Sequence, residues 1–357
     1  MTAILLLAAA APAPPVAARA DEARRAGRLI EAEKLYRQGV AASPAWADGW
    51  WALGTINYGL ERPAPCIAAF QRYLALDAKS ATGLAFLGLC QFQAGQWPAS
   101  LRTLEKAFDR GLPAADSLTA EAMLHLGMLH TRSSNFERAL QIATVMHREK
   151  ERPEVIALAG IAALRRAIFP QEMASDDREL VFKMGRAILL AADRHAAAAG
   201  ALFAELAAAY PTTPNVNFAY GSFLLATDPD RGIAELRKEL ALDPNHLPAL
   251  VTLAGELLKL GDVEGARQPA AHAAKIAPGN FPARAIHGRV LVETGEVPAG
   301  VAELETAMKL APDSPQVRFY LAAAYAKAGR KEDAARERAA FLKLKQQTKS
   351  IVAPEAK

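Results

Sequence analysis

A proline returns along this chain at a nearly constant interval. Pro211, Pro244, Pro278 and Pro312 lie 33, 34 and 34 residues apart, and each ends an amphipathic run rich in Ala and Leu. An interval near 34 residues indicates a stack of short, similar units, because one such unit cannot bury its apolar face alone. The functional question is therefore which surface of the stack binds a partner.

The copies share an order of features beyond the proline. A first helix carries a Leu-Gly or similar pair: Leu53-Gly54, Leu87-Gly88, Leu126-Gly127, Tyr220-Gly221, Leu253-Ala254, His287-Gly288 and Leu321-Ala322. A turn glycine follows, at Gly27, Gly95, Gly261, Gly295 and Gly329. A second helix then carries a small residue, at Ala32, Cys66, Ala139, Ala266, Gly300 and Ala334. Small residues let two helices approach closely, and the turn glycine takes a positive φ at little cost.

At these positions the sequence resembles the tetratricopeptide repeat family. One copy follows the family spacing at Trp50, Leu53, Gly54, Cys66 and Phe70, with Asn57 in place of the family's Tyr and Ala78 in place of its Pro. The last copy follows it at Arg318, Leu321, Ala322, Tyr325, Gly329 and Ala334. The resemblance covers most of the chain. It implies an all-α fold, a right-handed α-solenoid of stacked helix-turn-helix repeats.

Composition agrees with a helical fold and excludes some functions. Hydrophobic residues make up 52% of the chain, and Val, Ile and Thr form no alternating strand-like runs. The net charge of +4 is spread along the chain instead of forming a basic stripe with interleaved aromatic residues, so we do not expect nucleic-acid binding. No apolar run reaches the ~20 residues that a membrane-spanning helix needs, so no integral membrane span is expected.

The first 20 residues are typical of a weak export signal. A short apolar run over 4–11 precedes small residues at Ala18 and Ala20, which predicts cleavage between Ala20 and Asp21. The expected location is periplasmic or secreted. Because no Lys or Arg precedes the apolar run, a cytoplasmic location is the alternative.

The period divides the remaining chain into four parts. These are an N-terminal array over 21–148, an irregular helical segment over 149–210, a C-terminal array over 211–345 that ends in a capping helix, and a disordered tail over 346–357. Within the irregular segment we expect helices over 155–168, 178–192 and 196–209, with a Pro-bearing loop over 169–176. We interpret this segment as a decayed repeat with an insertion that acts as a spacer; a partner-binding loop is the alternative.

Residues that carry chemistry are sparse. No phosphate-binding loop, nucleophile elbow or metal-binding His pair occurs, so no catalytic residue, metal or cofactor is predicted. His125 and His130 are five residues apart, which does not place both rings on one helical face. Cys66 and Cys90 form no C-x-x-C pair, and we interpret them as small buried packing residues. A disulfide between them in an oxidising compartment is the alternative.

The resemblance implies a ligand surface on the concave face, built from positions of the first helices. In this sequence we assign to that partner-binding groove Trp51, Thr55, Tyr58, Ala85, Leu89, Phe92, Leu124, Met128, Phe218, Leu225, Val251, Arg289 and Phe319. The Lys and Asn residues with which the family clamps a partner's terminal carboxylate are largely missing from these positions. Trp51, Tyr58 and Phe92 are the favoured aromatic anchors, although aromatic residues at this spacing also form the core between repeats.

Together these features predict a non-enzymatic interaction scaffold or co-chaperone-like adaptor. It would bind another protein or a peptide segment in an apolar concave groove. A self-assembling structural solenoid, and so a homo-oligomer, is the alternative. An enzyme with an unfamiliar site comes third.

Overall fold

The computed structural model describes residues 13–113, 117–149 and 152–352. These residues form helices and turns, with no strand among them, so the predicted all-α solenoid is confirmed. The chain divides into two compact units, Met1–Arg194 (unit 1) and His195–Lys357 (unit 2). The boundary falls inside the segment 149–210 that the sequence sets apart, so that segment is shared between the units.

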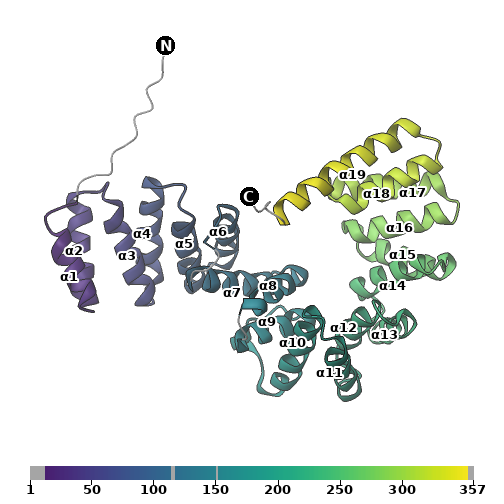
Figure 1. The fold of residues 1–357 in the computed structure, drawn as a ribbon, viewed down its shortest axis with the longest axis horizontal. Coiled ribbons are helices and arrows are strands. Elements are labelled where there is room, and N and C mark those ends of the chain that lie inside the picture. Colours follow the sequence, from purple (N-terminus) through teal and green to yellow (C-terminus); the bar gives the residue numbers. More distant parts are fainter. Residues whose placement is uncertain (1–12, 114–116, 150–151, 353–357) are drawn as a thin grey trace, which may run out of the picture. The chain divides into compact units, whose positions relative to one another are not determined.

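Unit 1 is a series of antiparallel helix pairs, in which each pair packs on the next (Figure 1). Its helices are α1(Ala17–Arg25), α2(Leu29–Ala42), α3(Ala47–Gly59), α4(Pro63–Leu76), α5(Ala81–Gln93), α6(Trp97–Asp109), α7(Ser117–Arg132), α8(Phe136–Glu149), α9(Pro153–Ala163) and α10(Arg178–Ala192). Two short 3₁₀ turns, η1(Pro170–Glu172) and η2(Ser175–Asp177), lie between α9 and α10.

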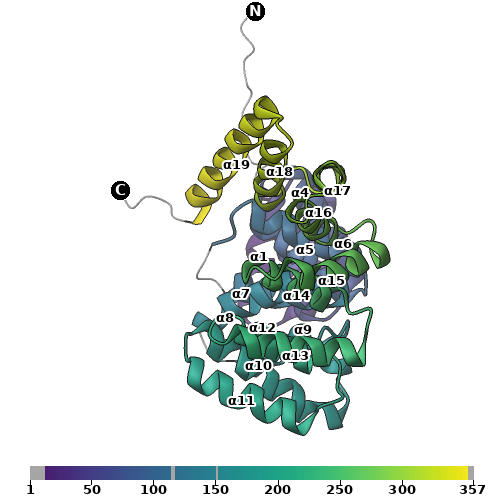
Figure 2. The same cartoon turned by 90° about the vertical axis from the view of Figure 1, so that its right-hand side faces the viewer.

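Unit 2 begins with one extra helix and continues in pairs. Its helices are α11(Ala196–Ala209), α12(Val216–Leu224), α13(Pro229–Leu242), α14(Leu247–Lys259), α15(Val263–Ile276), α16(Phe281–Glu293), α17(Val297–Leu310), α18(Pro315–Lys327) and α19(Lys331–Val352). The last helix is longer than its partner and runs past the end of α18 in both views (Figures 1 and 2).

The turns between paired helices confirm the glycine prediction. Each predicted turn glycine has a positive φ: Gly27 at 73°, Gly95 at 70°, Gly261 at 81°, Gly295 at 89° and Gly329 at 75°. Where a copy lacks this glycine, another residue adopts the same left-handed conformation: Glu61, Ser134, Arg165 and Arg194. The left-handed turn is therefore kept in these copies as well, although this conformation is less favourable for a residue with a Cβ atom than for glycine.

The Leu-Gly pairs provide space for a large side chain of the opposite helix. A Cβ atom added to Gly54 would lie 2.5 Å from the ring of Phe70, and one added to Gly88 would lie 2.6 Å from Leu104. Both Phe70 and Leu104 are fully buried. Because the glycine of the first helix has no side chain, it leaves the space that a large side chain of the second helix fills.

The helices α9 and α10 approach still more closely. A Cβ atom on Gly160 would overlap the carbonyl oxygen of Val181, and one on Gly185 would overlap that of Ile156. The predicted helices 178–192 and 196–209 are confirmed as α10 and α11. The helix predicted over 155–168 is too long, because α9 ends at Ala163 and Arg165 turns the chain with a φ of 53°.

Both ends of the chain differ from the sequence expectations. The predicted tail over 346–357 is wrong for residues 346–352, which continue α19; this stretch has no Gly or Pro, and the first helix breaker is Pro354. Residues 353–357 and 1–12 lie outside the described part. The expected cleavage point between Ala20 and Asp21 falls within α1, where Ala20 is fully buried and Asp21 accepts a hydrogen bond from the Tyr36 hydroxyl.

The two cysteines are buried, as expected, but they are not independent packing residues. Cys66 in α4 and Cys90 in α5 form a disulfide, with their Cα atoms 6.0 Å apart. Both are fully buried against Phe70 and Leu87. The preferred interpretation, that these are two unpaired cysteines, is therefore wrong, and the alternative of a disulfide is correct. The reason is that α4 packs on α5 of the next helix pair and brings the two sulfur atoms together. The number of residues between the cysteines does not show this contact.

Candidate functional site

Unit 2 contains a groove made of two adjoining hollows. One, of about 570 Å³, is lined by residues of α16 to α19. The other, of about 210 Å³, is lined by residues of α14, α16 and α18 and by Leu225, which directly follows α12. The two hollows share Arg289, Gln316 and Tyr320. We call this continuous surface the unit 2 groove. Most of its lining comes from the first helices of successive pairs.

Arg289 lies where the two hollows meet. Its guanidinium carbon is 5.1 Å from the ring centroid of Tyr320, a cation–π contact. Within the described residues no carboxylate pairs with Arg289, because the nearby acids are engaged elsewhere. Glu256 pairs with Lys259 at 2.6 Å, and Glu293 pairs with Lys327 at 2.6 Å. Within the part of the chain that the structure describes, the groove therefore presents a half-buried cation that forms no ion pair, although Glu256 and Glu293 line the same groove.

An aromatic cluster closes the end of the groove at α18 and α19. The ring of Phe319 lies 5.6 Å from that of Phe341 and 6.0 Å from that of Tyr320. Phe319 is nevertheless 55% exposed. An aromatic face held in place by neighbours but open to solvent is suited to contact with a partner.

The positions assigned to unit 2 from the sequence fall mainly in this groove. Leu225, Val251 and Arg289 line the smaller hollow, and Arg289 and Phe319 line the larger one. Phe218 lines neither; it packs on His246, with the ring centroids 5.0 Å apart. The sequence did not single out Gln316, Tyr320 or Phe341, and Phe341 comes from the helix to which the sequence assigned only a capping role.

The positions assigned to unit 1 belong largely to its core. Ala85, Leu89 and Met128 are buried, with 0%, 1% and 3% exposed, so their assignment to a groove surface is corrected. The reason is that a helix position defines a face but does not show how deeply the next helix pair covers it. Leu124 also packs against this core while remaining partly exposed.

The aromatic residues Trp51 and Tyr58 pack between repeats. The ring of Trp51 lies 5.6 Å from Phe70 and 5.4 Å from Phe86, and Tyr58 lies 5.6 Å from Phe86. Burial, together with the charge of Glu121, raises the pKa of the Tyr58 hydroxyl to about 12. Thr55, between them in sequence, donates from Oγ1 to the Trp51 carbonyl at 3.2 Å. These side chains serve the packing of unit 1.

The third predicted anchor, Phe92, is covered by the chain's own Pro-bearing loop. Phe169 of that loop is buried, with its ring 5.3 Å from Phe92 and 5.3 Å from Trp97. Arg132 stacks over both Trp97 and Phe169, and its Nη1 atom lies 2.8 Å from Glu172 Oε2. The loop is thus folded back on α5 and α7, and it occupies surface that the sequence assigned to a partner.

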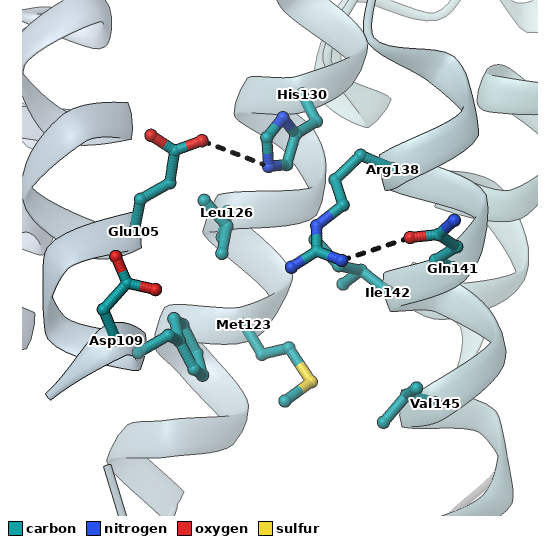
Figure 3. A pocket seen from close by; sticks show the side chains of 10 residues that line it. Glu105, Asp109, Met123, Leu126, His130, Arg138, Gln141, Ile142 and Val145 are labelled. Atoms are coloured by element: carbon teal, nitrogen blue, oxygen red, sulfur yellow. Dashed lines mark hydrogen bonds and ion pairs between the residues drawn. The ribbon is translucent and has the colours of Figure 1, made fainter. Parts of the chain in front are cut away.

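A hollow of about 410 Å³ in unit 1 lies between the second helices α6 and α8, with α7 beneath (Figure 3). His130 of α7 and the carboxylates of Glu105 and Asp109 line it. Apart from an isolated histidine, no sequence pattern indicates this site, because its walls come from two different copies.

Two general features of the described residues bear on function. Among them, no group of three or more His, Cys, Asp or Glu side chains is arranged to hold a metal ion. The helices of this same part of the chain include none that combines the length and apolar character required to cross a membrane.

Comparison with known proteins defines the class. The tetratricopeptide repeat model matches residues 87–146 and 287–343, so both units carry tetratricopeptide repeats, and the expected resemblance is confirmed. The chain is thus a repeat protein of the kind that typically serves as a protein-interaction scaffold. No curated protein matches the chain.

Among solved structures, similar chains are those of MamA. A MamA double mutant of RS-1 is 18% identical, with a TM-score of 0.43, over 50% of this chain and 99% of that one. A MamA fragment from Desulfovibrio magneticus RS-1 is 18% identical, with a TM-score of 0.43, over 49% of this chain and 98% of that one. MamA of AMB-1 is 22% identical, with a TM-score of 0.40, over 46% of this chain and 99% of that one. We draw no inference about function from this likeness.

Proposed function

We propose that this protein is an interaction scaffold whose unit 2 groove binds an extended segment of a partner protein. In the bound segment an acidic residue meets Arg289, and an apolar residue near it meets Phe319. The observation that carries the proposal is the cation of Arg289, which lies in the groove without a carboxylate partner among the described residues.

Electrostatics supports an acidic segment. A half-buried guanidinium has lost part of its hydration already in the unbound protein, which costs free energy. A bound carboxylate offsets this cost through charge-assisted hydrogen bonds. Arg289 has a planar donor group already oriented by its stacking on Tyr320. Little side-chain entropy is therefore lost when the carboxylate binds.

Shape supports an extended segment with a neighbouring apolar side chain. The groove crosses several helix pairs, so one compact residue does not fill it. Phe319 and Phe341 form an aromatic wall on which an apolar side chain buries area. A groove that receives unfolded or extended segments also suits a co-chaperone-like adaptor, which remains part of the proposal.

The test is selection of peptides from a random displayed library on the full chain. We expect enriched peptides to combine an acidic residue with an apolar residue nearby. Arg289→Glu should remove this enrichment, and Phe319→Ala should weaken binding of the selected peptides by about tenfold. Arg237→Glu is the matched control, because Arg237 is exposed on α13 and does not line the groove. Equal enrichment by wild type and Arg289→Glu would refute the proposal.

Export to an oxidising compartment is a separate proposal. Its support is the disulfide between Cys66 and Cys90, because disulfides persist mainly in secreted and periplasmic proteins. N-terminal sequencing and thiol counting on the protein from its native cells test it together. Free thiols at both cysteines in the native protein would contradict export.

A further inference from the structure

The hollow in unit 1 between α6, α7 and α8 has a polar side chain buried at its base. His130 is 3% exposed, and neither of its ring nitrogens has a hydrogen-bond partner. The nearest polar group is the Glu105 carboxylate, whose Oε1 atom lies 3.8 Å from Nε2, beyond hydrogen-bond distance (Figure 3). Buried polar groups in proteins are rarely left without partners, so an unused imidazole points to an absent ligand.

The imidazole of His130 is neutral at physiological pH. Burial, together with the smaller effect of the Arg138 charge, lowers the pKa of this ring to about 4. The Glu105 carboxylate acts in the opposite direction, but it is half exposed and therefore screened by water. A neutral ring keeps one nitrogen as a hydrogen-bond acceptor, and no group among the described residues donates to it.

The wall formed by α6 is acidic. Glu105 and Asp109 lie one helical turn apart, so their carboxylates share a face and line the hollow together. In the part of the chain that the structure describes, neither carboxylate pairs with a Lys or Arg. Two carboxylates and an imidazole acceptor around one space form a site for a group with several N–H donors and a positive charge.

The base and the opposite wall complete the site. Met123, Leu126 and Ile142 give an apolar floor that suits a hydrocarbon stem. On α8, Arg138 donates to the side-chain oxygen of Gln141 at 3.1 Å instead of to a carboxylate. The remaining guanidinium donors of Arg138 are therefore available to carbonyl oxygens of a bound backbone.

We propose that this hollow binds an arginine side chain from a segment of a partner protein. The aliphatic stem lies over Met123, Leu126 and Ile142, and the guanidinium donates to Glu105, Asp109 and the acceptor nitrogen of His130. Arginine fits better than lysine because its planar group carries five donors and reaches several acceptors at once. The open rim, where Arg138, Gln141 and Val145 are exposed, favours a longer segment over a free small molecule.

The experiment follows the His130 ring by NMR in the full chain labelled at histidine. The signal is assigned by its loss in His130→Gln. The probe is a capped peptide, Ala-Ala-Arg-Ala-Ala, and the comparison peptides carry Lys, Leu or Glu at the central position. We expect a saturable shift of the His130 signal with the Arg peptide, a weaker one with Lys, and none with Leu or Glu.

Variants separate the proposed contacts from a general charge effect. Glu105→Gln combined with Asp109→Asn should weaken binding of the Arg peptide at least about tenfold. The control, Asp48→Asn with Glu154→Gln, removes the same charge from exposed sites of unit 1 outside the hollow and should leave binding unchanged. Because all four side chains are exposed, these variants should fold.

Several outcomes would overturn the proposal. These are no shift of His130 at saturating peptide, equal binding of the Leu or Glu peptide, or undiminished binding by the variant that lacks both carboxylates. Free arginine amide that binds as tightly as the peptide would show a small-molecule site instead. The test is independent of the unit 2 groove, because Arg289 does not line this hollow, and Arg289→Glu should therefore bind the Arg peptide as wild type does.

Discussion

Gly160 in α9 and Gly185 in α10 pack backbone against backbone. A Cβ atom at either position would overlap a carbonyl oxygen of the opposite helix, that of Val181 or that of Ile156. Backbone atoms cannot rotate away as side chains do, so the two helices must move apart to admit even one methyl group. These two glycines therefore determine how closely α9 and α10 approach each other. They lie in the segment where the sequence departs most from the repeat period.

We therefore predict that Gly185→Ala destabilises unit 1 by about 3 kcal/mol, as does Gly160→Ala. Urea unfolding followed by tryptophan fluorescence measures this in the full chain, because all four tryptophans lie in unit 1. Gly59→Ala is the control: no atom lies within 4 Å of a Cβ at this position near the end of α3. That variant should be neutral or slightly more stable. A small effect of Gly185→Ala would show that α9 and α10 are less tightly packed.

Glu61 occupies a turn position that other copies give to glycine. Its φ is 53°, and its side chain is exposed. Replacing it with Gly removes the steric cost of the left-handed conformation, so Glu61→Gly should stabilise unit 1 by about 1 kcal/mol. Glycine introduced at an exposed position inside a helix, as in Lys34→Gly of α2, should instead destabilise unit 1 by about 1 kcal/mol. Opposite signs in the two urea midpoints are the expected result, and destabilisation by both variants would contradict it.

The buried His130 makes the stability of unit 1 depend on pH. Its pKa falls from 6.5 to about 4 on folding. The folded state thus binds fewer protons, and the contribution is fully present above pH 6.5 and is lost as the pH falls toward 4. Between pH 7 and pH 5 the loss is about 2 kcal/mol.

The measurement compares urea unfolding of wild type and His130→Gln at these two values of pH. The variant should show a smaller loss between them, by about the amount that His130 contributes. His195→Gln, an exposed histidine of unit 2, serves as the control and should behave like wild type. An equal loss in wild type and His130→Gln would mean that the ring is protonated without cost.

The disulfide between Cys66 and Cys90 predicts that reduction destabilises unit 1. Cys66 and Cys90 are 24 residues apart, and cross-linking a segment of this length restricts the unfolded chain by about 3 kcal/mol. Dithiothreitol should lower the unfolding midpoint of unit 1, read by tryptophan fluorescence. Cys66→Ala with Cys90→Ala should match the reduced protein and should not respond to the reductant. Two reactive thiols in the unfolded, non-reduced protein would contradict this pairing.

The repeat pattern predicts the local structure well because each copy carries its own signals. The turn glycine at Gly95 and the recess at Gly54 act within a single helix pair, so a few neighbouring residues determine them. The bounds of α10 and α11 follow from the same kind of local information. Arg165 shows the limit: the turn after α9 uses a residue with no intrinsic preference for a positive φ, and the sequence therefore predicts too long a helix.

The sites depend on contacts between copies, and these are harder to predict. Register places Met128 on the first helix but does not show that the next pair covers it. His130 forms a site only with acids of α6 and an arginine of α8, and no single segment contains that pattern. Glu105 and Asp109 share one helix face, but Arg102 and Lys106 each lie one turn before one of them, so in sequence this face is the same as an ordinary solvated one.

The loop that covers Phe92 has a consequence for how unit 1 folds. Most contacts in a repeat array join neighbouring helices, so they form quickly and at low cost in chain entropy. The contact between Phe169 and Phe92 instead spans four intervening helices, α6 to α9. Closing that long segment is entropically more costly than any hairpin, and its gain comes only after the intervening pairs are ordered. Docking of Phe169 therefore belongs to the late steps of folding, after the repeats that it covers have formed.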